Sequence, residues 1–214
     1  VMALPPAAGL AMAEAMTAAR RPSVIWLPFQ ECTGCTESIT RSHSPTIESL
    51  IFNVISLDYQ ETLMAAAGHQ AEEALQQAIK DNFGKYLLIV DGSIPLGQDG
   101  AYSTIGGKSN LETLKEVAKG AAAIVAMGSC AAYGGIPKAN PNPTGAVSVS
   151  DVIKDKPIVN IPGCPPIPRP STVKPFMIVA TAGLFTTKAS LPRLSTTKGH
   201  VTGGACSSWV ARGR

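Results

Sequence analysis

Cysteine is the residue type in this sequence best suited to metal chemistry, and its spacing is informative. Cys32 and Cys35 form a Cys-x-x-Cys pair, whereas Cys130 and Cys164 stand alone and Cys206 follows near the end. The two thiolates of the pair can bind one metal centre without strain. They supply only half of the ligands that a structural zinc ion or an iron–sulfur cluster takes. The other ligands must come from distant parts of the chain.

Composition excludes several classes of protein. Five cysteines, an odd number spread over 214 residues, are not typical of a disulfide framework. Residues 1–168 carry 11 basic and 15 acidic residues, whereas residues 169–214 carry seven basic residues and no acid. No nucleic-acid-binding motif accompanies this break, so we expect no nucleic-acid partner. No apolar run is long enough to predict a membrane span.

The elements that would position the cysteines follow an α/β rhythm from residue 22 onward. Short apolar runs predict buried strands, and the longer segments between them predict helices. The expected strands are 23–28, 52–59, 86–90, 121–127 and 157–161, and the expected helices are 36–41, 65–82 and 110–120, the last with Asn110 as its N-cap. This alternation predicts an α/β fold with an open, parallel, five-stranded sheet and helices on both faces.

In such a sheet, ligands bind beyond the carboxyl ends of the strands. Cys32 and Cys35 follow the first expected strand, Cys130 follows the fourth, and Cys164 follows the fifth. We therefore expect all four at one edge of the sheet, around a common ligand. Their long separations favour an iron–sulfur cluster in a preformed fold, because structural zinc sites usually use two close pairs. The alternative is that Cys130 and Cys164 are small buried hydrophobic residues.

Six short motifs together resemble the small subunit of nickel–iron hydrogenases. They are Cys32-Thr-Gly-Cys35-Thr-Glu-Ser, Ile55-Ser-Leu-Asp-Tyr59, Ala66-Ala-Gly-His-Gln70, Asp91-Gly-Ser-Ile-Pro95, Gly128-Ser-Cys130 and Pro162-Gly-Cys-Pro-Pro166. The resemblance implies a flavodoxin-like domain over residues 22–168 that holds one 4Fe–4S cluster, the proximal one. It implies that Cys32, Cys35, Cys130 and Cys164 are the cluster ligands.

The same resemblance implies a function in hydrogen oxidation, H2 = 2H+ + 2e-. The nickel–iron centre and the catalytic residues would lie in a separate large subunit, and this chain would carry the electrons away. A membrane cytochrome b is a further expected partner, and the periplasmic face of the cell membrane is the expected location. Glu31 and Thr33 would face the large subunit, either orienting the interface or relaying protons. The alternative for these two residues is a simple hydrogen-bonded polar pair.

Two rival hypotheses stay open. The first is the cluster subunit of a quinone-reductase-like complex, although those relatives have adjacent cysteines where this chain has Cys32-x-x-Cys35. The second is an inactive, truncated metal-binding remnant, because residues 169–214 lack the cysteine pattern expected for medial and distal clusters. For this irregular tail we expect poor order and hypothesise a disrupted reading frame. Residues 1–21 are expected to be the remnant of an export signal or an N-terminal helix.

Overall fold

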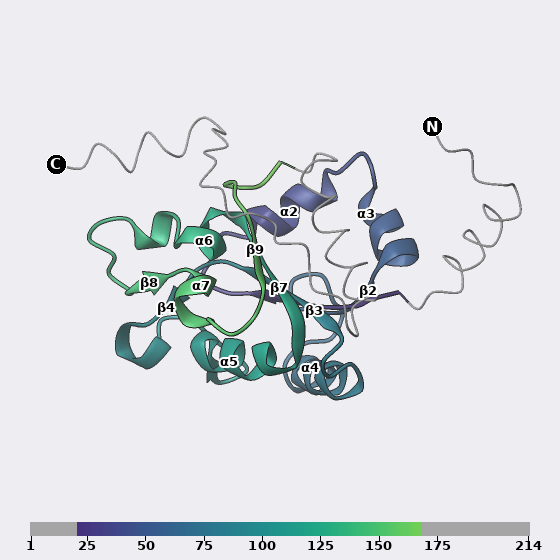
Figure 1. Ribbon diagram of the computed structural model, residues 1–214, viewed down its shortest axis with the longest axis horizontal. Coiled ribbons are helices and arrows are strands. Elements are labelled where there is room, and N and C mark those ends of the chain that lie inside the picture. Colours follow the sequence, from purple (N-terminus) through teal and green to yellow (C-terminus); the bar gives the residue numbers. More distant parts are fainter. Residues whose placement is uncertain (1–20, 168–214) are drawn as a thin grey trace, which may run out of the picture.

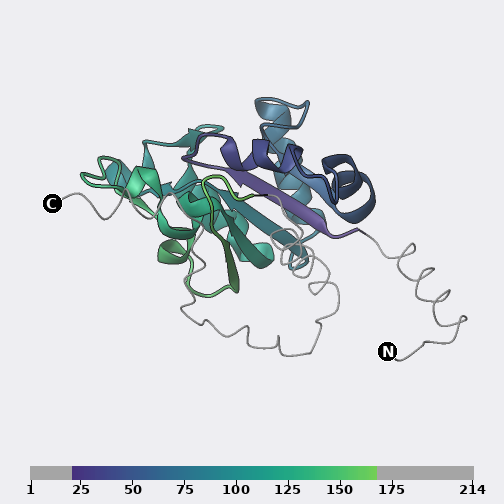
Figure 2. The ribbon, with the colours of Figure 1, turned by 90° about the horizontal axis from the view of Figure 1, so that it is seen from above.

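A five-stranded parallel sheet forms the centre of the computed structural model, which describes residues 21–167 (Figure 1). The strands are β1 (Ser23–Pro28), β2 (Ser56–Gln60), β3 (Tyr86–Asp91), β7 (Ala121–Met127) and β9 (Ile158–Ile161). Their spatial order is β2-β1-β3-β7-β9, which is the order of flavodoxin-like sheets. The predicted fold class is therefore confirmed, and Figure 2 shows the strands lying side by side.

Helices cover both faces of the sheet, as the sequence predicts. They are α2 (Gly34–Thr40), α3 (Ile47–Ser49) with a π-helical turn after it (Leu50–Val54), α4 (His69–Asp81), α5 (Asn110–Gly120), α6 (Gly128–Tyr133) and α7 (Val149–Val152). Helices α2 and α3 lie on one face, and α4 and α5 lie on the other (Figure 1). The connection from β1 to β2 runs in the opposite direction to the later ones, so right-handed crossovers place their helices on opposite faces.

Short elements extend the edge where the strands end. Strand β4 (Ile94–Pro95) pairs with β8 (Ala146–Val147), and β5 (Thr104–Ile105) pairs with β6 (Lys108–Ser109), both antiparallel. Two 3-10 turns, Gly97–Gly100 and Ile136–Lys138, complete these loops. The β4–β8 pair joins the loop after β3 to the loop after β7.

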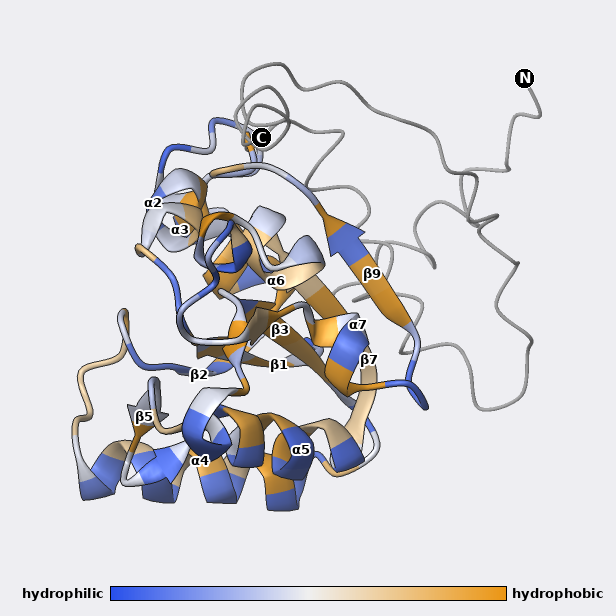
Figure 3. Cartoon of the chain, turned by 90° about the vertical axis from the view of Figure 1, so that its left-hand side faces the viewer, coloured by the Kyte–Doolittle hydropathy of each residue, from blue (hydrophilic) through white to orange (hydrophobic). Residues whose placement is uncertain are grey.

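The sheet separates two apolar cores. Strands β1 and β3 are buried along their whole length, because each has neighbours on both sides and cover on both faces. Ile25, Leu88 and Ile124 pack in the core beneath α4 and α5, whereas Ile89 and Val125 pack in the other core. In Figure 3, hydrophobic residues of α4 and α5 lie toward the sheet and hydrophilic ones lie outward.

Besides shifts of one residue at the ends of β2 and β3 and the start of β9, three elements and one helix cap differ from the sequence predictions. The second strand begins at Ser56 rather than at residue 52, because the preceding apolar residues form the π-helical turn. The long helix covers His69–Asp81 rather than 65–82, and the first helix covers Gly34–Thr40 rather than 36–41. The N-cap of α5 is Ser109, not Asn110, because the Ser109 side chain accepts the Glu112 amide in a capping box.

The expectations for residues 1–20 and 168–214 lie outside the described residues. These are the export-signal remnant or N-terminal helix, apart from residue 21, and the whole of the irregular tail. Among residues 21–167, the helices are too short or too polar to cross a lipid bilayer.

Candidate functional site

The four predicted cysteines lie around one pocket at the carboxyl edge of the sheet. Cys32 follows β1 and Cys35 lies in the first turn of α2, while Cys130 lies in α6 after β7 and Cys164 follows β9. The space between them is about 270 Å³, part of it open to solvent. The lining residues are Glu31, Cys32, Gly34, Cys35, Asp91, Ser129, Cys130, Gly163, Cys164 and Pro165. Glu31 therefore reaches the pocket, whereas Thr33 is not among the residues that line it.

The pocket opens on the side of Cys32 and Cys164. The side chains of these two cysteines are exposed, whereas those of Cys35 and Cys130 are partly buried. Cys35 and Cys130 lie on short helices packed against the sheet, and Cys32 and Cys164 lie on the loops that precede α2 and follow β9. The pocket therefore has a protein floor and a solvent-facing mouth.

Glycines leave room for the sulfur atoms. A Cβ atom added at Gly128 would lie 2.5 Å from Cys35 Sγ, and one at Gly135 would lie 2.6 Å from Cys130 Sγ. Both glycines have positive φ angles, 82° and 56°, which L-residues with side chains rarely adopt. Side chains at these positions would push the thiols out of place. The glycines thus shape the pocket as well as the turns.

We expect Gly128→Ala to destabilise the metal-free chain more than Gly107→Ala does. The φ angles are similar, 82° and 78°, but an added Cβ at Gly107 meets no atom within 4 Å. The positive φ costs each alanine roughly 1–2 kcal/mol. Overpacking against Cys35 Sγ adds about 1–3 kcal/mol at Gly128. Urea unfolding of both variants measures the difference, and equal losses of stability would contradict the close approach to the thiol.

The turn between the paired cysteines is strained. Thr33, the N-cap of α2, has φ 65° and ψ 0°, a left-handed conformation that is unusual for a β-branched residue. This turn directs the chain from the end of β1 into α2, so that Cys32 and Cys35 line the same pocket. The Thr33 hydroxyl donates a 3.3 Å hydrogen bond to Glu31 Oε1. This contact agrees with the simpler alternative, in which Glu31 and Thr33 are a hydrogen-bonded polar pair.

Buried carboxyl groups give the pocket floor its electrostatic character. Asp91, the last residue of β3, has no exposed surface, and neither of its carboxyl oxygens has a hydrogen-bond partner within bonding distance. Burial, together with the Glu31 charge, raises the pKa of Asp91 to about 7, although the nearby Cys35 thiol, Thr36 hydroxyl and Gly92 amide oppose the shift. Burial also raises the pKa of Glu31, and the Thr33 hydrogen bond lowers it.

The two partly buried thiols are hard to ionise without a bound cation. Burial raises the pKa of Cys35 far above its ordinary value, and the Asp91 charge adds to this effect. Burial raises the pKa of Cys130 to about 11, although the Ile136 amide donates toward its sulfur and opposes the shift. A positive metal centre would lower the pKa of both thiols, since thiolates are the metal-binding form.

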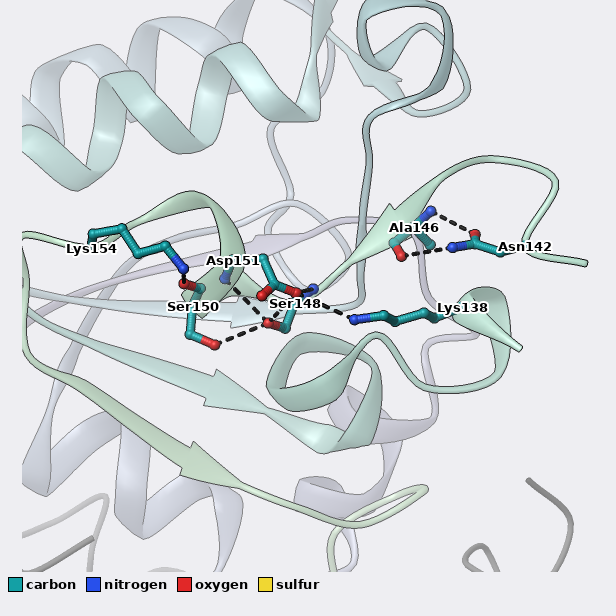
Figure 4. Close-up of polar contacts among 7 residues, drawn as sticks. All are labelled: Lys138, Asn142, Ala146, Ser148, Ser150, Asp151 and Lys154. Carbon is teal, nitrogen blue, oxygen red and sulfur yellow. Dashed lines mark hydrogen bonds and ion pairs between the residues drawn. The ribbon is translucent and has the colours of Figure 1, made fainter. Parts of the chain in front are cut away.

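Polar contacts brace the loop that follows Cys130 (Figure 4). Asn142 and Ala146 exchange two hydrogen bonds: the Asn142 side-chain amide donates to the Ala146 carbonyl, and the Ala146 amide donates to Asn142 Oδ1. Ser148 and Asp151 form the capping box of α7, and Lys138 Nζ lies 3.4 Å from Asp151 Oδ2. These contacts fix the loop that presents the Ile136 amide to Cys130.

The donor set fits a cluster better than a single ion. Within residues 21–167, no three His, Cys, Asp or Glu side chains converge closely enough to hold one metal ion. The four thiols instead surround a space, and the glycines beside them leave that space open. A zinc ion needs its ligands within about 2.3 Å of one point, whereas a four-iron cluster takes its four thiolates around a larger body. Four thiols around one space are a donor set that fits a cluster with four cysteine ligands.

Sequence reasoning assigned no role to three of the residues that build this site. All three lie within the motifs of the resemblance, and for Asp91 a carboxylate directly after a buried strand at the ligand-binding edge is itself a signal. Ser38 and Ser129 contact the loop that carries Cys164. Their hydroxyls gave no signal, because serine beside a turn or inside a short helix is common.

An α/β sheet with a thiol-lined pocket at its carboxyl edge is an arrangement that suits a metal-binding protein, and comparisons with known proteins identify the family. The family model described as NADH ubiquinone oxidoreductase, 20 Kd subunit, matches residues 32–173. The chain belongs to this family. Within it, the chain is a homologue of nickel–iron hydrogenase small subunits.

Two curated relatives show the degree of similarity. The Hydrogenase-2 small chain of Escherichia coli K12 is 50% identical over 168 residues, which cover 78% of this chain and 45% of the relative. The periplasmic [NiFe] hydrogenase small subunit of Solidesulfovibrio fructosivorans is 50% identical over 167 residues, covering 78% of this chain and 52% of the relative. The chain thus spans about half the length of these curated relatives.

A solved structure agrees with the fold. A chain of the reduced, active Ni-Fe-Se hydrogenase from Desulfomicrobium baculatum superposes with a TM-score of 0.77 at 34% sequence identity. The match covers 83% of this chain and 68% of that chain. The likeness therefore covers most of this chain.

Proposed function

We propose that this chain is the electron-transfer small subunit of a nickel–iron hydrogenase. One observation carries the proposal: four cysteines from three separate segments line one pocket, in a chain that is 50% identical over 168 residues to a hydrogenase small chain. In this proposal, Cys32, Cys35, Cys130 and Cys164 hold a single 4Fe–4S cluster, which would supply one-electron redox chemistry.

The residues of the chain would tune and protect that chemistry. The cysteines would bind as thiolates, and the glycines would allow backbone groups to approach the sulfur atoms. The Ile136 amide would donate a hydrogen bond to Cys130, a contact that tunes the potential of a sulfur-ligated centre. The buried floor formed by Asp91 and the α2 residues would exclude water from the inner side.

Anaerobic reconstitution of the full chain with iron and sulfide tests this proposal. About four irons and four sulfides per chain are expected, with an EPR signal in the reduced sample. A chain that takes up zinc but forms no cluster, or that stays folded without binding either, would overturn the proposal.

Exposed apolar side chains support a large partner at the mouth of the pocket. In the described part of the chain, six of the eight exposed large hydrophobic side chains follow the carboxyl ends of strands. They are Leu63, Leu96, Tyr102, Tyr133, Ile136 and Ile167. The other two, Phe52 and Phe83, precede strands at the opposite edge. The proposed occupant of the apolar edge is the hydrogenase large subunit, which would carry the nickel–iron centre.

We expect Ile136→Asp to weaken binding of a hydrogenase large subunit at least tenfold. Ile136 is 66% exposed beside Cys130, and a charge buried without a partner in an interface costs several kcal/mol. Phe52→Asp is the matched control, because Phe52 is 70% exposed but lies before β2 at the other edge. Co-purification with a tagged large subunit measures the effect. Equal losses from both variants would argue against docking at the pocket mouth.

Location and further partners are also proposals. The name of the Solidesulfovibrio fructosivorans relative describes a periplasmic protein, and this supports a periplasmic site for the present chain. Fractionation of cells that express the natural gene would test this location. The membrane cytochrome b stays a prediction, because no comparison bears on it.

The quinone-reductase alternative is less well supported. The family description names an NADH ubiquinone oxidoreductase subunit, so the alternative belongs to the same family. The curated relatives described above are hydrogenase small subunits, and the Cys32-x-x-Cys35 spacing departs from the adjacent cysteines of the alternative. Reduction of a quinone analogue by the reconstituted chain and its partner, without any response to H2, would favour the alternative.

A further inference from the structure

The loop formed by residues 162–167, here called the Cys164 loop, has less structural support than the other cysteine-bearing segments. Cys130 lies in α6, and Cys32 shares a short segment with Cys35 of α2, whereas the loop of Cys164 contains neither helix nor strand. The strand before it, β9, has four residues and lies at the edge of the sheet. The side chains of Cys164 and Pro165 are exposed, and only Pro166 in this loop is buried.

Two serines from the other segments hold this loop. Ser38 Oγ, on α2, lies 2.9 Å from the Pro166 carbonyl oxygen and 3.1 Å from the Cys35 carbonyl oxygen, so its hydroxyl can donate to either. Ser129 donates its backbone amide to the Gly163 carbonyl at 2.7 Å, and its hydroxyl accepts the Gly163 amide at 3.1 Å. Ser38 thus links the loop to the Cys35 segment, and Ser129 links it to the Cys130 segment.

Packing alone does not replace these contacts. Pro165 and Pro166 lie against two glycines: Cβ atoms added at Gly34 and Gly128 would each be 3.9 Å from one of these prolines. Glycine has no side chain that could pack against the prolines. A proline also lacks an amide proton, so Pro165 and Pro166 cannot donate hydrogen bonds. The Pro166 carbonyl is the group in this part of the loop that accepts a hydrogen bond from α2.

We propose that Ser38 is a positioning residue for Cys164, fixing the fourth thiol at the pocket through the Pro166 carbonyl. The consequence for the cluster rests on the proposed function, whereas the hold on the loop does not. Ser38 is 8% exposed, so its hydrogen bond is shielded from competing water. Its loss removes the hydrogen bond that ties the Pro166 carbonyl oxygen to α2.

The chain provides a matched control in Ser42. This serine lies just beyond the same helix and is 7% exposed, similar to Ser38, but its hydroxyl has no hydrogen-bond partner. Ser42→Ala therefore removes a similarly buried hydroxyl without breaking a bond. Ser38→Thr is the conservative variant, because it keeps a hydroxyl at the same position.

Two measurements on the full chain test the proposal. The first is the exchange rate of the Gly163 amide in the metal-free chain. The second, after reconstitution, is the rate at which an iron chelator removes the cluster, with the EPR spectrum of the reduced sample. Ser38→Ala is expected to accelerate both rates roughly three- to tenfold, as for the loss of one hydrogen bond. It should also change the EPR line shape, while Ser42→Ala leaves both rates and the spectrum unchanged and Ser38→Thr restores them.

The outcomes separate this proposal from the proposed function. If Ser38→Ala and Ser42→Ala give equal exchange rates, Ser38 does not hold the loop and the proposal is overturned. If exchange accelerates but cluster loss and the EPR spectrum do not change, Ser38 has a structural role only, which also overturns it. If the wild-type chain forms no cluster at all, the proposed function fails, and Gly163 exchange alone then decides whether Ser38 holds the loop.

Discussion

Replacing any one of the four pocket cysteines with alanine is expected to abolish the four-iron cluster. Each thiol comes from a different position around the pocket, so no neighbouring cysteine can take its place. Within residues 21–167, the pocket cysteines are the full set of cysteines. Iron should fall well below about four per chain, and the EPR signal of the reduced wild-type cluster should disappear.

Cys206→Ala is the matched control for these variants. It removes the same type of side chain, but Cys206 lies outside the described residues and outside the sequence motifs of the pocket. Its cluster content and EPR signal should equal those of the wild type. Loss of the cluster in Cys206→Ala, with retention in Cys164→Ala, would mean that Cys206 replaces Cys164 as a ligand.

Metal-free stability distinguishes ligand loss from misfolding. Cys32 and Cys164 are exposed, so their alanine variants should unfold at nearly the wild-type urea concentration. Cys35 and Cys130 are partly buried, and their variants should lose modest stability. A folded Cys164→Ala chain that binds no cluster would show that the thiol acts as a ligand. An unfolded chain would place its role in packing.

The fold was predictable because its signals are local and repeated. The apolar run at Ser23–Pro28 is fully buried and the run at Ala121–Met127 is mostly buried, and both strand bounds agree with the sequence predictions. The second strand was harder to place. Its expected start included Phe52, which belongs instead to the π-helical turn, where an apolar run is compatible with either helix or strand. The capping error at Asn110 arose because Ser109, its neighbour, is an equally good N-cap residue.

Strand topology was enough to predict that the four cysteines lie together, but not how their loops contact one another. Parallel strands end at the same edge, and this was enough to bring Cys130 and Cys164 to the Cys-x-x-Cys pair. Side-chain contacts between loops depend on how far each loop folds back, which no local pattern specifies. The link from Ser38 to the Pro166 carbonyl crosses 128 positions in the sequence, so only the folded chain reveals it.

We also expect Asp91→Asn to change how the stability of the metal-free chain depends on pH. Asp91 is fully buried, and the ionisable groups that act on it are Glu31 and the Cys35 and Cys130 thiols. Neither acid nor thiol offers it a positive charge. Burial therefore raises the pKa of Asp91 from its ordinary value of 3.8 to about 7. The folded chain keeps this proton at pH values where the unfolded chain has released it.

The number of protons that the folded and unfolded states bind at Asp91 determines how stability changes with pH. Below about pH 4, both states hold the proton, and Asp91 does not make stability depend on pH. Between pH 4 and pH 7, only the folded state holds it, so the wild-type chain loses stability as pH rises. The difference between 3.8 and about 7 corresponds to a loss on the order of 4 kcal/mol, after which the curve levels. Asparagine has no proton to release, so the Asp91→Asn variant does not lose this stability as pH rises.

Urea unfolding of the reduced, metal-free chain from pH 4 to pH 8 measures this difference. The stability of Asp91→Asn relative to the wild type should rise with pH up to about pH 7 and then remain constant. Asp151→Asn is the control of opposite sign, because hydrogen bonds from Ser148 lower the pKa of Asp151, and its contribution is lost as pH falls. A constant difference between Asp91→Asn and the wild type would mean that Asp91 ionises at its ordinary pKa. Its carboxylate would then be hydrated or paired in the folded chain, and the floor of the pocket would not be dry.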